Sequence, residues 1–158
     1  MINFRDFLAY DPETGLLTWV GGDPRCVGKV AGSKSKKGYV TVEVQGMRYR
    51  AHLIAFWFMT GEWLPNEVDH RDRDGGNNCW ANLRKATATQ QTANKRLSSR
   101  SKTGFKGVSK SGKHTYRATL STTAEGRRHL GSFATPELAH ARWLEEAVKC
   151  YGEFACAG

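Results

Sequence analysis

The amino-acid sequence predicts an α+β protein in two parts: a mixed unit of short strands and helices through residue 97, and a three-stranded antiparallel sheet packed on one helix after residue 104. Strand-like runs throughout the chain are short and separated by Gly, Pro and Asn turns, while helical periodicity is confined to a few segments. A polar, small-residue stretch over 98–103 reads as a linker. The 158 residues suffice for one small domain plus a module.

The first part opens with a Pro- and Gly-containing turn over 11–15, which leads into a strand over 16–19. Alternating β-branched and polar residues predict a hairpin over 39–50. Residues 52–60 are apolar almost all round and predict a buried helix that ends near Gly61.

The next block combines short strands with a polar loop. Strands are expected over 67–69 and about 83–86, with an Asp-, Gly- and Asn-rich loop over 71–78 between them, and a helix is expected over about 88–97. The second part shows strand-like runs over about 104–109, 115–121 and 127–133. A helix then begins after Thr135, with Pro136 in its first position.

Composition indicates the class of partner. The formal net charge of +9 favours a polyanion such as nucleic acid. The longest apolar run, Leu53 to Met59, is far shorter than the ~20 residues of a membrane-spanning helix, and the N-terminus has no basic-then-apolar leader, so no membrane partner and a cytoplasmic location, in a host cell if the protein is phage-encoded, are expected. The spacing of the four cysteines matches neither a zinc finger nor a disulfide scaffold.

Charge is unevenly divided in the second part. Residues 98–133 carry eight Lys or Arg against one acid, whereas residues 136–158 carry two against four, so the net charges are +7 and −2. A basic sheet backed by an acidic helix presents one face that suits phosphates.

The residues best suited to chemistry begin at Asp69-His70. Asp69 offers a carboxylate, and Gln91 or Asn94 offers an amide oxygen, which are ligands that a hard divalent cation prefers. A neutral histidine beside such an ion can take a proton from water near pH 7. Both sets of residues also have a structural interpretation. Asp69 and His70 could be a hydrogen-bonded pair that stabilises a loop. His52 could be a histidine of the hydrophobic core, although a supporting role at the site is also open to it.

Four features together resemble the ββα-metal motif of HNH endonucleases of the phage and intron-encoded homing type: Asp69-His70, Asn77-Asn78, Asn82-Leu83-Arg84 and the helix through Gln91 and Asn94. The likeness extends over about residues 3–97. Taken alone, Gly75-Gly76 and Asn77-Asn78 are ordinary turn residues, so Asn78 is only a supporting candidate.

The resemblance implies a role for each matching residue. His70 would be the general base that activates water, Asp69 a metal ligand, and Asn82 the Asn that holds the loop. The family's last ligand falls on Gln91, with Asn94 as the substitute. The implied cofactor is one divalent metal ion, Mg²⁺ or else Mn²⁺, and the reaction is metal-assisted phosphodiester hydrolysis.

Residues 104–156 resemble an AP2-type DNA-binding domain, through Gly104-Phe105-Lys106-Gly107-Val108, Tyr116 to Leu120, His129 to Phe133 and Tyr151 to Ala155. That family lays its sheet in the DNA major groove. Period-2 alternation turns four side chains away from the helix: Arg117, Thr119, Arg127 and His129. Lys106 and Lys110 are the other expected DNA contacts.

The sequence therefore predicts an HNH endonuclease domain over 1–97 and an AP2-like domain over 104–158 that act on double-stranded DNA, as a nicking or homing-type enzyme. The alternative is a DNA-binding regulator whose HNH-like unit is inactive, which Gln91 favours. An RNA-binding protein is a weaker reading, because a sheet suited to the major groove reads DNA better than A-form RNA.

Overall fold

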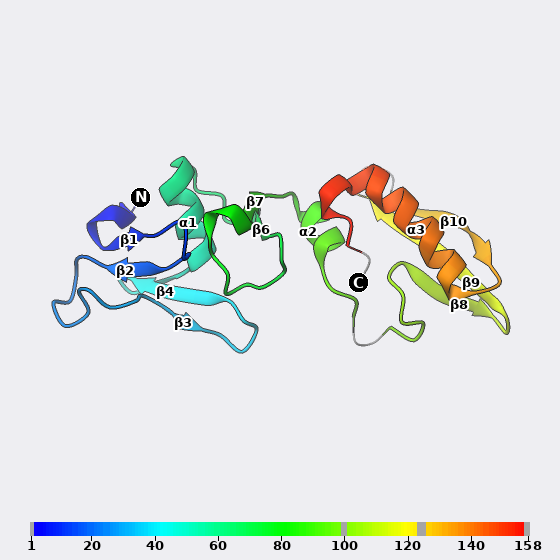
Figure 1. The fold of residues 1–158 in the computed structure, drawn as a ribbon, viewed down its shortest axis with the longest axis horizontal. Helices are drawn as coiled ribbons and strands as arrows, with labels where there is room; N and C mark the ends of the chain where they lie inside the picture. The colour runs from blue at the N-terminus through cyan, green and yellow to red at the C-terminus, as the bar shows by residue number, and fades with distance from the viewer. Residues whose placement is uncertain (1, 99–100, 123–125, 157–158) are drawn as a thin grey trace. The chain divides into compact units, whose positions relative to one another are not determined.

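The computed structural model describes residues 2–98, 101–122 and 126–156, and within them the chain forms small antiparallel sheets and a few helices (Figure 1). In chain order the elements are η1 (Phe4–Asp6), β1 (Leu8–Tyr10), β2 (Leu17–Trp19), β3 (Ser33–Lys34), β4 (Val40–Val44), β5 (Met47–Arg50), α1 (Ala51–Thr60), β6 (Val68–His70), η2 (Trp80–Asn82), β7 (Leu83–Lys85), α2 (Ala88–Asn94), β8 (Val108–Gly112), β9 (Thr115–Thr122), β10 (Gly126–Phe133), α3 (Pro136–Tyr151) and η3 (Gly152–Phe154).

The chain divides into two compact units, Met1–Thr87 and Ala88–Gly158. The division falls at the start of α2, ahead of the predicted linker over 98–103. Of that linker, residues 99–100 lie outside the described residues. Helix α2 therefore belongs to the second unit.

The first unit surrounds α1 with three antiparallel sheets, β1-β2, β3-β4-β5 and β6-β7. Helix α1 is apolar on every side because it packs on two hydrophobic clusters at once. Ile54 lies among side chains of η1, β1, β2 and β4, while Phe56 lies among those of β6 and β7. The helix ends where Gly61 adopts φ 75°, a left-handed C-cap, as the sequence predicts.

The predicted hairpin over 39–50 is confirmed as β4 and β5, joined at Gln45-Gly46. The two short strands that flank the polar loop also form. β6 pairs with β7 in the register His70↔Leu83 and Asp69↔Arg84, so the ends of the loop are fixed by a ladder.

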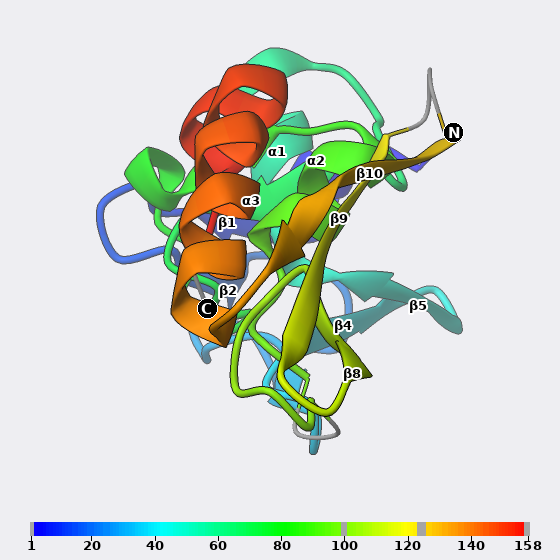
Figure 2. The same ribbon diagram turned by 90° about the vertical axis from the view of Figure 1, so that its right-hand side faces the viewer.

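The second unit has the sheet order β10-β9-β8, with α3 along one face (Figure 1, Figure 2). Ala118 and Leu120 of β9 point toward Ala139, Trp143 and other buried residues of α3. Thr135 caps the helix, since its side chain accepts the backbone N–H of Leu138, and Pro136 occupies the first turn. The three-stranded sheet packed on one helix is thus present.

The largest differences from the predicted boundaries are in α2 and β8. α2 ends at Asn94 instead of continuing to about residue 97, and β8 spans Val108–Gly112 instead of about residues 104–109. The delay of β8 has a physical cause. Gly104 and Gly107 have φ of +74° and +73°, and a Cβ on Gly107 would lie 2.1 Å from the Trp143 ring, so this segment turns under α3 before the strand starts.

Within the described residues, every helix is too short or too polar to cross a bilayer. The four cysteines are free thiols.

Candidate active site

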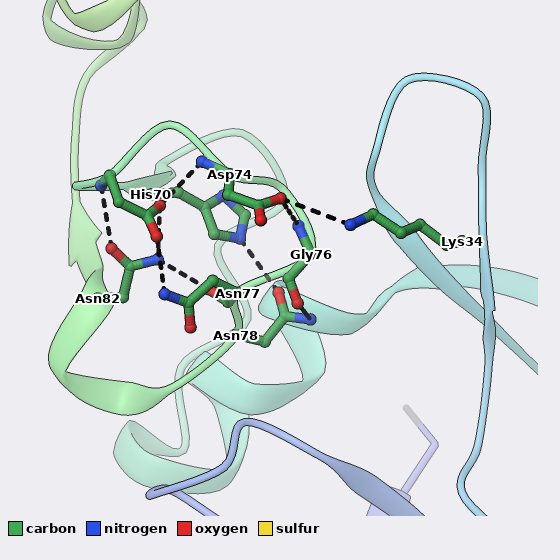
Figure 3. Close-up of polar contacts among 8 residues, drawn as sticks. Lys34, His70, Asp74, Gly76, Asn77, Asn78 and Asn82 are labelled. Atoms are coloured by element: carbon green, nitrogen blue, oxygen red, sulfur yellow. Dashed lines mark hydrogen bonds and ion pairs between the residues drawn. The ribbon is translucent and has the colours of Figure 1, made fainter.

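The polar loop between β6 and β7 is held from inside by Asn82, which is 9% exposed (Figure 3). Its Oδ1 accepts the backbone N–H of Asp72 at 3.0 Å. Its Nδ2 donates to Asp72 Oδ1 at 2.9 Å and to the carbonyl of Asn77 at 2.8 Å. One amide therefore holds two residues of the loop, Asp72 and Asn77, through three hydrogen bonds.

Asp72 is the second centre of this network. Its Oδ2 accepts from Asn77 Nδ2 at 2.7 Å, and its Oδ1 accepts the backbone N–H of Asp74 at 2.8 Å. Burial alone would raise the pKa of Asp72. The hydrogen bonds from Asp74, Asn77 and Asn82, with a smaller contribution from His70, outweigh that effect and hold the pKa below its usual value. Asp72 thus stays an acceptor at neutral pH.

His70 ends β6 and is 4% exposed. Its Nε2 lies 3.1 Å from Asn78 Oδ1, while Asn78 Nδ2 donates to the carbonyl of Gly76 at 3.4 Å. That second bond turns the amide so that its oxygen faces His70. Nε2 must then carry the hydrogen of a neutral ring, and the basic lone pair lies on Nδ1.

Asn78 is itself anchored to the first strand. The Tyr10 hydroxyl donates to the backbone carbonyl oxygen of Asn78 at 2.7 Å. Burial, and then the nearby Cys79 and Asp11, raise the pKa of Tyr10 to about 12, so the phenol keeps its hydrogen throughout the neutral range. The expected supporting residue Asn78 thus lies against His70, and β1 helps to fix it.

Two aromatic rings enclose the other side of His70. The His52 ring from α1 lies 4.8 Å from it, centroid to centroid, at 75°, and Tyr39 lies 6.0 Å from His70 and 5.8 Å from His52. His52 Nδ1 has no hydrogen-bond partner within the described part of the chain. Burial, and then the charges of His70 and Arg50, lower the pKa of His52 to about 3. His52 is therefore an uncharged ring packed beside His70 at pH 7.

Asp69 faces Arg84 across the β6-β7 ladder. Oδ2 of Asp69 lies 3.2 Å from Arg84 Nη2 and 3.3 Å from Nε, with side-chain exposures of 15% and 6%. Among residues 2–98, 101–122 and 126–156, no three His, Cys, Asp or Glu side chains gather as a metal site. Asp69 supplies one carboxylate, an oxygen ligand of the kind that Mg²⁺ takes from proteins.

The two other predicted ligands, Gln91 and Asn94, lie on α2 in the second unit. Asn94 is buried at 6% exposure, and Gln91 is half-buried. Their role as ligands stays a prediction.

Four of the six predicted DNA contacts, Arg117, Thr119, Arg127 and His129, share the face of the sheet that is turned away from α3. His129 stands directly opposite Thr119 in the ladder, and the side chains of Arg117, Arg127 and His129 are exposed. The alternation on which the prediction depends is present, because Ala118 between them is fully buried.

Lys106, whose contact with DNA stays a prediction, has contacts within the second unit. Its ammonium group donates to the backbone carbonyls of Ala93 and Lys95 at the end of α2, and it lies 5.7 Å from the centroid of the Trp143 ring. A cation at the C-terminus of a helix satisfies its last carbonyls, which is a stabilising role. Lys110, by contrast, is exposed on β8.

Tyr39 is a site residue that sequence reasoning missed. It lies before β4, with no motif around it, and reaches His70 only through long-range packing. The Gly75-Gly76 pair carried the available signal. Neither glycine has a positive φ, so a turn requirement does not explain them, whereas a close approach by a neighbouring side chain does.

Residues 49–93 match the family model described as HNH endonuclease. The matched segment runs from the end of β5 through α1, the polar loop and most of α2, and so includes His52, His70 and Asn82. This match supports an HNH nuclease that acts on DNA. Neither the curated proteins nor the solved structures contain a match to the chain.

Proposed function

We propose that this protein is a metal-dependent endonuclease that hydrolyses phosphodiester bonds in double-stranded DNA, as a nicking or homing-type enzyme. The observation that carries the proposal is the HNH match over 49–93. It falls on a loop that Asn82 holds together and in which Asn78 contacts a buried histidine.

In this proposal His70 is the general base. Asn78 keeps the hydrogen of the neutral ring on Nε2, so Nδ1 takes the proton from the attacking water. The hydroxide forms a bond to phosphorus as the bond to the 3′ oxygen breaks. Asn82 positions the loop, while His52 and Tyr39 restrict water around the imidazole.

Asp69 would hold the metal ion, together with Gln91 or Asn94 from α2. Bound Mg²⁺ or Mn²⁺ stabilises negative charge on the phosphate and on the departing oxygen. Arg84 fixes the Asp69 carboxylate, which orders a ligand in advance of the ion.

The outward face of β8, β9 and β10 is proposed to bind duplex DNA in the manner of an AP2-type domain. Support comes from the +7 charge of residues 98–133 and from the exposed Arg117 and Arg127 on one face. This assigns cleavage to residues 1–97 and most of the binding energy to residues 104–158.

An inactive DNA-binding regulator is the second candidate. Gln91 stands where the family has a shorter Asn or His, and Asp69 already has a cationic partner in Arg84. Both features would weaken a metal site.

Incubation of the pure protein with supercoiled plasmid decides between the two. The endonuclease converts the plasmid to nicked or linear forms with Mg²⁺ or Mn²⁺, and a chelator stops the reaction. Tight plasmid binding with no conversion in either metal would favour the regulator. Asp69→Ala should weaken Mn²⁺ binding in a calorimetric titration, and an unchanged affinity would remove Asp69 as a ligand.

A further inference from the structure

The hairpin formed by β3 and β4 precedes the HNH-matched segment in the sequence. It nevertheless packs on the polar loop between β6 and β7, at two glycines of that loop. A Cβ on Gly75 would lie 2.6 Å from Cδ1 of Tyr39, and a Cβ on Gly76 would lie 2.7 Å from Lys34 Nζ. At Gly75 the Tyr39 ring leaves no room for a side chain, while at Gly76 the neighbour is the flexible end of Lys34, which can move.

This contact places two cations beside the loop that bears His70. Lys34 Nζ lies 3.8 Å from Asp74 Oδ1, and Figure 3 shows the Lys34 side chain reaching from the hairpin toward the loop. The Arg50 guanidinium lies 5.1 Å from the centroid of the Tyr39 ring, which in turn lies 6.0 Å from His70. Tyr39 thus separates a cation from the imidazole.

The charge of this segment is strongly one-sided. Residues 29–50 carry six Lys or Arg and a single acid, Glu43, for a net +5. The next ten residues, α1, carry no charged side chain. The first unit therefore has a basic stretch of its own, independent of the basic sheet in the second unit.

Stability does not explain these cations. The Lys34 and Asp74 side chains are 58% and 54% exposed, and an exposed pair at 3.8 Å contributes little to the stability of a fold. Arg50 is also exposed and makes no side-chain capping bond to α1, which it precedes. Both groups remain accessible to an anionic ligand.

We propose that the β3-β4-β5 sheet, with Lys34 on β3 and Arg50 at the end of β5, is the phosphate-binding edge of the active site. Lys34 and Arg50 contact backbone phosphates of the DNA strand on either side of the phosphate that is cut, and Tyr39 is the positioning residue that holds the hairpin against the loop. The inference rests on the proposed endonuclease function for the identity of the strand. Contacts of this kind fix the register of a strand without reading its sequence.

The test compares Lys34→Gln and Arg50→Gln with the wild type, all as full chains. Duplex affinity is measured by anisotropy over a range of salt concentrations in the presence of a chelator, and cleavage kinetics are measured with metal. Each variant should lower the salt slope of binding by about one unit per lost phosphate contact. KM should rise several-fold while kcat changes less than twofold, and Arg50→Lys should restore the slope.

Arg25→Gln is the matched control. It removes the same charge, but Arg25 pairs with Asp23 in the loop between β2 and β3, at the far left of Figure 1. Its salt slope should equal that of the wild type. Asp74→Asn distinguishes a Lys34 that contacts phosphate from a Lys34 that only pairs with Asp74 to hold the loop. If Lys34 binds phosphate, this variant binds DNA as well as or better than the wild type.

The inference is overturned if Lys34→Gln and Arg50→Gln keep the wild-type slope and KM, or if Asp74→Asn reproduces the Lys34→Gln defect. A wild-type protein that never cuts DNA would refute the endonuclease instead. The slope comparison in chelator would still show whether the β3-β4-β5 sheet contacts phosphate.

Discussion

Acidification should destabilise the first unit through His52, and the structure sets the size of the effect. The folded pKa of about 3 lies well below the ordinary value of 6.5. Between these two pH values His52 is protonated in the unfolded chain but not in the folded chain, so the free energy of unfolding falls as the pH falls. Above about pH 6.5 His52 is neutral in both states, and the free energy of unfolding is not reduced by its protonation. At pH 5 the loss is about 2 kcal/mol, from 1.4 kcal/mol per pH unit over about 1.5 units.

His52→Leu isolates this term. Leucine fills a similar apolar space and never ionises, and His52 Nδ1 has no hydrogen bond within the described residues that would be lost. Urea denaturation followed by tryptophan fluorescence reports mainly the first unit, because Trp19, Trp57, Trp63 and Trp80 lie there and only Trp143 lies in the second. Between pH 7 and pH 5 the wild type should lose about 2 kcal/mol more than His52→Leu. Equal losses would show that His52 is not held neutral by burial.

Three further outcomes follow from the packing. Asn82→Ala should lower the unfolding free energy by about 1–3 kcal/mol, measured by urea denaturation, because it leaves buried backbone groups of the loop unpaired; no change would mean that the loop does not depend on this amide. Gly75→Ala should cost about 1–3 kcal/mol by overpacking against Tyr39. Most of that cost should vanish in a Tyr39→Ala background, whereas strict additivity would place the strain elsewhere. Arg117→Glu should weaken duplex binding in anisotropy titrations by about tenfold, that is, by about 1.4 kcal/mol. Arg142 lies on α3 and pairs with Glu145, so Arg142→Glu should have little effect on duplex affinity. Equal losses of affinity in the two variants would show that the sheet is not the DNA-binding face.

Local patterns predicted most of the elements because they act within a few residues. The hairpin at Gln45-Gly46, the helix that stops at Gly61 and the cap at Thr135 depend on turn and cap chemistry that can be recognised in the sequence. The boundary of β8 could not be predicted in this way. It depends on Trp143, nearly forty residues later, which occupies the space above Gly107.

The residues of the candidate site also differ in whether local sequence indicates them. Asp69-His70 and Asn82 are close in sequence, and the resemblance to the HNH motif indicates them, with Asn78 as a supporting residue. No such signal indicates Tyr39, because its approach to His70 depends on how a distant hairpin packs. Lys106 shows the opposite case: a basic residue in a basic segment serves the end of α2 in the structure. Charge counts alone do not distinguish a lysine that contacts DNA from one that caps a helix.

The central claim is that His70 is the base of a DNA-cutting site, and His70→Ala tests it most directly. Wild type and variant are compared in two assays: plasmid conversion with Mg²⁺ or Mn²⁺, and duplex affinity in chelator. General-base catalysis contributes about 10²–10⁴-fold, so plasmid conversion should fall at least a hundredfold while DNA affinity stays within about twofold. Cleavage at the wild-type rate by His70→Ala would contradict the account.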